Sequence, residues 1–195
     1  MKKFELTAEF VTNVFGKKLF RIKALVAFGD VEKGELGGFI EKEDNLSHDG
    51  NAWVYGNARV FGNARVSGNA RVFGNARVSG NAQVSGDARV SGNAWVYGNA
   101  QVSGDARVYG NAQVSGDARV YDDADYAVVK GFGRCFRTTT FFRCKDKILR
   151  VQCGCFYGDL AQFREIVKKT HGDSKYAKEY LAIADLMELH FSDEY

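Results

Sequence analysis

The sequence predicts a mainly β protein whose middle part is a parallel β-solenoid, a stack of short strands wound into coils. A six-residue unit of Gly, Asn or Asp, Ala, a variable residue, Val and a second variable residue recurs with little interruption. Val occurs at every sixth position from Val54 to Val120, and Ala lies two positions before each Val. Proline is absent from the chain, which suits uninterrupted strand ladders.

Residues 1–49 are expected to form an N-terminal β cap. The stretches KKFELTA and KKLFRIKALVAF are strand-like, and GDVEKGELGGFI leads into the repeat. A solenoid exposes strand edges and apolar core at its ends, so a capping segment is expected there.

Residues 50–127 are expected to form the solenoid. Ala-x-Val alternates inward and outward as a short strand does, and Gly-Asn or Gly-Asp supplies the corner. Three units close a triangular coil of about 18 residues, and coils stack about 4.8 Å apart. The pattern also extends weakly outward, with Ile40 and Leu46 in the Ala position upstream and Tyr126 in the Val position downstream.

Residues 128–195 are expected to form a small ββαα module. RTTTFFRC and KILRVQCGCF read as a hairpin that turns at residues 145–147. Asp159 is the predicted N-cap of a first helix that ends at Gly172, and Ser174 is the predicted N-cap of a second.

The repeat V-S-G-N-A-R resembles the hexapeptide repeat, aliphatic-x-x-x-small-x, of the left-handed parallel β-helix in bacterial acyltransferases. The resemblance implies this fold and its left-handed winding. Here Gly lies one position later than in most members of that family, so the corner geometry is expected to differ.

The segments FGDVEKGELGGFIEKEDNLSHDG at the front and CGCFYGDLAQFREIVKKTHGDSKY at the back resemble accessory proteins of phages and prophages of Gram-positive bacteria. This resemblance covers essentially the whole chain. It implies a protein made in the cytoplasm of a bacterial host.

Composition excludes several functional classes. Twenty-seven Lys and Arg nearly balance 24 Asp and Glu, so the chain does not mimic an acidic polymer. No window has the roughly 18 apolar residues of a membrane span, and the N-terminus lacks a signal-peptide pattern. We therefore expect a cytoplasmic protein without a membrane partner.

The sequence offers no catalytic or metal site and implies no cofactor. The regular repeat contains no His, whereas hexapeptide acyltransferases use a His as general base, and His48, His171 and His190 lie outside it. Cys135, Cys144, Cys153 and Cys155 are too widely and irregularly spaced for a zinc knuckle. Cys153 and Cys155 have the same strand parity, so both are expected in the core, with zinc binding as the alternative.

The strongest binding candidate is one solenoid face. Residues 18 apart should stack, so Trp53, Arg71, Arg89 and Arg107 form one column, and Tyr55, Phe73 and Tyr109 belong to the next. Arg and aromatic residues concentrate interface energy, although they also pack well across strands without any partner. Each of Arg89 and Arg107 follows an Asp by two residues, which would partly neutralise it. A second candidate is the C-terminal module around Arg164, Lys168 and Lys169.

These features favour a non-enzymatic protein that binds and inhibits a host protein with an acidic surface. Because of the phage resemblance, an antiviral defence nuclease of the CRISPR type is the leading candidate partner. Two alternatives stay open: an acyltransferase-like enzyme acting at a trimer interface, and a structural, self-assembling element. Nucleic acid is a weaker candidate ligand, and the oligomeric state is left open.

Overall fold

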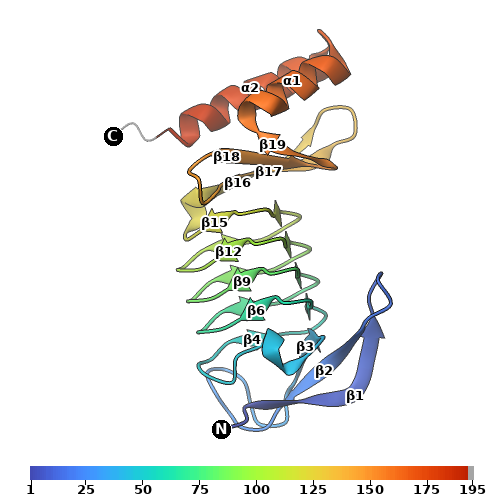
Figure 1. Cartoon of the computed structure of the whole chain (residues 1–195), viewed down its shortest axis with the longest axis vertical. Helices are drawn as coiled ribbons and strands as arrows, with labels where there is room; N and C mark the ends of the chain where they lie inside the picture. The colour runs from blue at the N-terminus through green and yellow to red at the C-terminus, as the bar shows by residue number, and fades with distance from the viewer. Residues whose placement is uncertain (193–195) are drawn as a thin grey trace.

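The computed structural model describes residues 1–192 and has three parts stacked along its long axis (Figure 1). An N-terminal antiparallel sheet lies at one end and a parallel β-solenoid in the middle. A four-stranded sheet with two helices lies at the other end. The predicted mainly β fold with coils of about 18 residues is confirmed. Left-handed winding stays a prediction of the family resemblance.

Twelve two-residue strands build the solenoid and form three parallel ladders of four. One ladder contains β4 (Trp53–Val54), β7 (Arg71–Val72), β10 (Arg89–Val90) and β13 (Arg107–Val108). The second contains β5 (Arg59–Val60), β8 (Arg77–Val78), β11 (Trp95–Val96) and β14 (Gln113–Val114). The third contains β6 (Arg65–Val66), β9 (Gln83–Val84), β12 (Gln101–Val102) and β15 (Arg119–Val120).

The solenoid core is uniform because the same two residue types repeat in register. Every repeat Val and Ala from Ala52 to Val120 has no exposed surface. Val66 pairs with Val84, Val84 with Val102, and so on along each ladder. The side chains therefore stack in columns inside a narrow three-sided tube.

Side-chain hydrogen bonds between coils explain why Asn or Asp follows Gly at each corner. Asn side chains form ladders 18 residues apart: the Asn63 amide donates to Asn81, and Asn81 donates to Asn99. Asn99 then donates to Asp117. An ionised carboxylate accepts hydrogen bonds but cannot donate one, so Asp can only end such a ladder.

The corner glycines also stack, which allows a matched test. Gly86 and Gly110 have φ values of +66° and +70°, so a side chain strains either corner. A Cβ on Gly86 would lie 2.9 Å from the Gly104 nitrogen, whereas a Cβ on Gly110 meets nothing within 4 Å.

We expect Gly110→Ala to cost about 1–2 kcal/mol from backbone strain alone. Gly86→Ala should cost about 1–3 kcal/mol more, because the extra methyl group overpacks the stacked corner. Urea denaturation of both variants measures the difference. Equal losses of stability would show that the coils separate freely at the corner.

The N-terminal cap extends one solenoid ladder. Strands β1 (Phe4–Thr12) and β2 (Lys18–Ala24) form a hairpin, and β2 pairs with β3 (Leu36–Ile40). β3 pairs in parallel with β5, so the sheet order is β1-β2-β3-β5-β8-β11-β14.

Ile40 and Leu46 occupy the Val position, not the Ala position that we predicted. Ile40 pairs with Val60 and Leu46 with Val66, a spacing of 20 residues. The first coil is two residues longer than the others because its corner at residues 47–51 is extended. A strict six-residue register misses this insertion.

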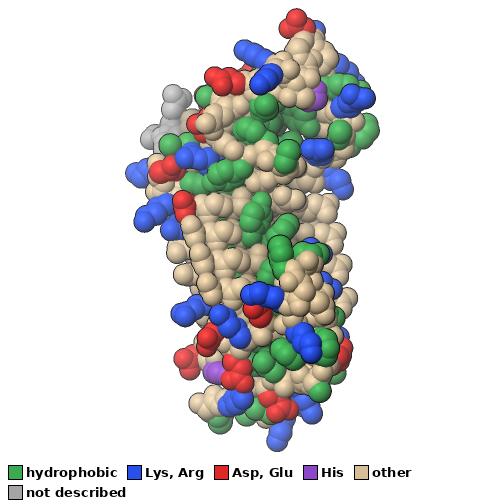
Figure 2. Space-filling model, turned by 45° about the vertical axis from the view of Figure 1, so that its right-hand side comes forward, with side chains coloured by type: hydrophobic (Ala, Val, Ile, Leu, Met, Phe, Trp, Pro, Cys, Tyr) green, Lys and Arg blue, Asp and Glu red, His purple; other side chains and the backbone are tan. Residues whose placement is uncertain are grey.

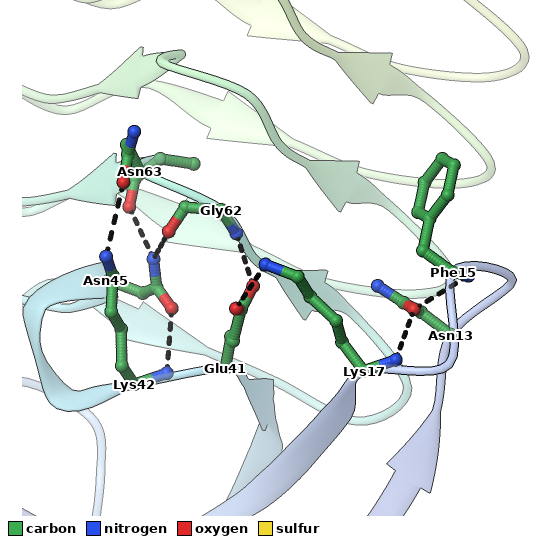
Figure 3. Close-up of polar contacts among 9 residues, drawn as sticks. Asn13, Phe15, Lys17, Glu41, Lys42, Asn45, Gly62 and Asn63 are labelled. Atoms are coloured by element: carbon green, nitrogen blue, oxygen red, sulfur yellow. Dashed lines mark hydrogen bonds and ion pairs between the residues drawn. The ribbon is translucent and has the colours of Figure 1, made fainter.

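Polar side chains from the N-terminal part hydrogen-bond to the backbone of the first coil. The Asn45 amide donates to the carbonyls of Gly62 and Ala64 (Figure 3), and it lies in the short 3-10 helix η1 (Glu43–Asn45). Glu41 accepts from the Gly62 N–H at 2.7 Å and from Lys17 Nζ at 2.8 Å. Burial raises the pKa of Glu41, but these hydrogen bonds outweigh it and hold the pKa below its usual value.

The C-terminal module contains the predicted hairpin and two helices, and two further strands extend its sheet to four. The helix η2 (Asp123–Asp125) leads into β16 (Tyr126–Phe132), which pairs with β17 (Arg137–Arg143). The predicted hairpin is β17 with β18 (Leu149–Cys153), and β19 (Phe156–Asp159) follows. We missed β16 because Tyr126 fits the repeat pattern, and β19 because it has only four residues.

Both predicted helices are confirmed, with their caps. The Asp159 carboxylate accepts from the Gln162 N–H at the start of α1 (Leu160–His171), and Gly172 ends that helix. Ser174 caps α2 (Lys175–His190). No helix within residues 1–192 is both long and apolar enough to cross a membrane.

Candidate functional site

The predicted columns of one solenoid face are present. Arg89 pairs in register with Arg71 on one side and with Arg107 on the other. Trp53 stacks below Arg71. Because the strands are parallel and in register, these outward side chains occupy equivalent positions on successive coils.

The lower end of this face is covered, so the Trp53 side chain is not accessible to a partner. Its side chain has no exposed surface, and its indole contacts the rings of Phe4 and Phe28 edge-on at 6.2 and 5.4 Å. The N-terminal segment therefore uses the first coil as its own packing surface. The repeat is the same in every coil, so its pattern does not show which coil the N-terminal segment covers.

Two further predicted binding residues, Arg71 and Tyr55, interact with Asp30 of the N-terminal cap. Arg71 forms an ion pair with Asp30 at 2.9 Å, and the Tyr55 hydroxyl donates to the same carboxylate at 3.2 Å. Burial, with the neighbouring Asp30 charge, raises the pKa of Tyr55 to about 12. Both side chains are already engaged within the chain.

The upper part of the face is free of such cover. Arg89 and Arg107 are exposed, and within residues 1–192 neither forms an ion pair. Phe73 and Tyr109 beside them are 38% and 63% exposed. We call Phe73, Arg89, Arg107 and Tyr109 the Arg89 face.

Asp87 does not neutralise this face as the sequence suggested. Its carboxylate accepts from the Asn69 amide in a corner ladder and forms no ion pair with Arg89. Asp123 accepts from the backbone N–H of Arg107 at 2.8 Å and not from its guanidinium group. The two guanidinium groups are therefore available to a partner.

A hollow of about 380 Å³ adjoins Tyr109 where the solenoid meets the C-terminal sheet. Its lining includes Asp123, Tyr126, Lys130 and Thr138. The hydroxyl of Tyr126 donates to the carbonyl of Arg107, and its ring meets Tyr109 edge-on at 6.5 Å. Sequence reasoning missed this hollow because it depends on β16.

The second predicted site is only partly available. Arg164 forms ion pairs with Asp185 at 2.8 Å and Glu188 at 2.7 Å, and these hydrogen bonds raise its pKa further. Lys168 and Lys169 are exposed on α1. Arg164 thus joins the two helices, while the two lysines remain solvent-facing.

Each of the three histidines packs against aromatic side chains of the chain. His48 lies in the extended first corner, where Nδ1 accepts from the Lys3 N–H and the ring stacks on Phe4 at 4.3 Å. Its Nε2 is 3.7 Å from Glu43. His171 lies against Tyr176 and Tyr180, and His190 lies against Phe191.

The four cysteines are free thiols that differ in exposure. Cys144 is buried and Cys153 is half-buried, while Cys135 and Cys155 are exposed. Cys155 lies in the tight turn between β18 and β19, so its predicted core position is wrong. Within residues 1–192 no three His, Cys, Asp or Glu side chains are grouped as a metal ion requires.

Comparison with known proteins identifies the repeat. The family profile described as the YdcK beta solenoid repeat matches residues 52–68, 64–80, 70–86, 82–98, 100–115 and 112–124. Among curated proteins, none matches the chain. This chain is therefore a β-solenoid protein whose repeats are similar to those of YdcK, and its solenoid has about five turns.

Proposed function

We propose that this chain is a non-enzymatic binding protein that uses the Arg89 face to bind an acidic surface of a partner protein. The observation that carries the proposal is the pair of exposed guanidinium groups, Arg89 and Arg107, without an ion pair in the described chain. Exposed Phe73 and Tyr109 flank them. Arg and aromatic side chains of this kind dominate interface energy.

The scaffold suits recognition because it presents these groups with little freedom. Strands β7 and β10 of the face pair on both sides, and β13 pairs with β10 on one side. The side chains beneath the face are fully buried Val and Ala. A partner therefore meets a pre-organised surface and loses less entropy on binding.

The closed ends of the solenoid argue against the self-assembling alternative. The Ala118–Cys144 bridge and the bond from the Lys145 N–H to the Asp117 carbonyl join the last coil to the C-terminal module. At the other end, Lys3 Nζ donates to the carbonyls of Gly50 and Ala52. Solenoids stack end to end through open edges, and here these edges are engaged.

The acyltransferase-like alternative lacks support from the one histidine near the coils. Both ring nitrogens of His48 face groups of this chain, the Lys3 N–H and the Glu43 carboxylate. A general base needs a nitrogen that reaches the substrate. The acyltransferase-like alternative would therefore require a trimer in which another His serves as the general base.

The identity of the partner rests on sequence resemblance. Likeness to phage accessory proteins supports a phage-encoded protein that acts in the host cytoplasm. A host defence nuclease of the CRISPR type is the partner that we propose to test first. Such a nuclease must offer an acidic patch to two stacked arginines.

We expect Arg89→Glu/Arg107→Glu to abolish capture of this partner in a pull-down with purified nuclease. The matched control is Arg65→Glu/Arg77→Glu, which makes the same charge change at exposed positions on the other two ladders. The control should retain capture. Equal capture by both double variants and the wild type would refute the Arg89 face and direct attention to Lys168 and Lys169.

A further inference from the structure

The C-terminal module contains a pocket of about 480 Å³ that the proposed function does not use. It lies between the sheet and the two helices, and its apolar lining comes from Phe156, Phe163, Ile166 and Val167. Small-molecule sites are usually concave, mostly apolar and roughly 300–1,000 Å³ in volume. The size and lining of this pocket fit that class.

The charge in the lining has one sign. Arg134 and Arg137 contribute to it, and no Asp or Glu among the described residues does. Neither arginine forms an ion pair within residues 1–192. Figure 2 shows hydrophobic side chains gathered in the C-terminal part of the molecule, with charged side chains of both signs around them.

The Arg137 guanidinium packs closely against Gly154, which has no side chain to obstruct it. A Cβ on Gly154 would lie 2.4 Å from Nη1 of Arg137, and Gly154 has a φ of +61°. The guanidinium thus lies against the β18–β19 turn and lines the pocket. Only a residue without a side chain allows this approach.

Tyr180 and Cys153 contribute polar groups to the pocket lining. Tyr180 is buried, and its hydroxyl donates to the Phe132 carbonyl at 3.3 Å. Burial, with the nearby Cys153, raises the pKa of Tyr180 to about 12, so the phenol stays neutral. The Cys153 thiol accepts from the Thr139 hydroxyl at 3.2 Å. Neither group adds a negative charge that would repel an anion.

We propose that this pocket binds a small organic monoanion with an apolar tail, such as a medium-chain carboxylate. The tail lies against the apolar lining from α1 and β19, and the carboxylate faces Arg134 and Arg137. Arg pairs well with carboxylates because its planar group donates two parallel hydrogen bonds. This proposal is independent of the Arg89 face.

Decanoate is the probe, and calorimetric titration of the full chain is the measurement. We expect saturable binding at one site, and Arg134→Gln/Arg137→Gln should weaken it about tenfold or more. Lys168→Gln/Lys169→Gln is the matched control, because it removes two positive charges from α1 outside the pocket lining. The control should bind as the wild type does.

Two further measurements separate this pocket from general surface adsorption. Decanol, which has the same tail without the charge, should bind about tenfold more weakly. Decanoate should also slow alkylation of Cys153, a lining thiol, as followed by peptide mass spectrometry. Absence of saturable decanoate binding, equal weakening in both double variants, or unprotected Cys153 would overturn the proposal.

Discussion

Val84→Asp is expected to destabilise the protein by about 3–5 kcal/mol, because it places a carboxylate in the dry core without a partner. Val84 lies in the middle of the solenoid, has no exposed surface and stacks between Val66 and Val102. The surrounding Ala and Val side chains offer no hydrogen-bond donor to the new group. Protonation of the acid avoids the charge but still leaves a buried polar group unsatisfied.

The neighbouring outward position supplies the control for this substitution. Gln83 lies on the same strand, β9, and is exposed. Gln83→Asp introduces the same side chain one residue away and should change stability by less than about 0.5 kcal/mol. Urea denaturation followed by circular dichroism measures both variants. Equal stability of the two would contradict the assigned inward and outward register.

The solenoid could be predicted in detail because one short period specifies it. Every repeat Ala and Val that the pattern assigned to the core is buried, and the predicted columns pair in register. Because the repeat is strict, the inward and outward positions assigned in one coil apply to the next coil as well. This assignment fails where the repetition ends, as at Ile40 and Leu46, where two extra residues shift the register.

The candidate site was only half predictable for the same reason. The sequence shows that Trp53 and Arg89 share a column, but it does not show which coil the N-terminal segment covers. That segment meets Trp53 through Phe4 and Phe28, and it meets Arg71 through Asp30. These contacts join residues more than 20 positions apart in the chain, and the six-residue repeat does not predict them.

The C-terminal pocket was beyond sequence reasoning because its parts come from several elements. Arg137 begins β17, Cys153 ends β18, and Phe163 and Tyr180 lie on different helices. Each had a local explanation as strand or helix residue. Only the packing of the helices on the sheet brings them around one cavity.

Strand β17 contributes side chains to two hydrophobic cores, because its successive residues point to opposite faces of the sheet. Substitutions on either face are expected to cause the second large loss of stability. Phe142 belongs to the solenoid core with Tyr126 and Cys144, whereas Phe141 packs against the helices with Phe163. Both phenylalanines have no exposed surface. Successive strand residues point to opposite faces, so one strand closes the solenoid and supports the helices at once.

Phe142→Ala and Phe141→Ala should each cost about 3–5 kcal/mol, the usual loss for deletion of a buried Phe side chain. The location of the damage should differ between them. Loss of Phe142 leaves a cavity above the last coil, so hydrogen exchange should accelerate in β12–β15. Loss of Phe141 should accelerate exchange in α1 and α2 first, because the cavity lies beneath the helices.

Hydrogen-exchange mass spectrometry of the two variants distinguishes these patterns. The solenoid coils contact their neighbours in sequence, so damage at one end should fade along the stack and leave β4–β6 protected in Phe142→Ala. The same pattern of exchange in both variants would show that the module and the solenoid unfold as one unit. In that case β17 would not separate two cores, and the C-terminal sheet would be an integral last layer of the solenoid.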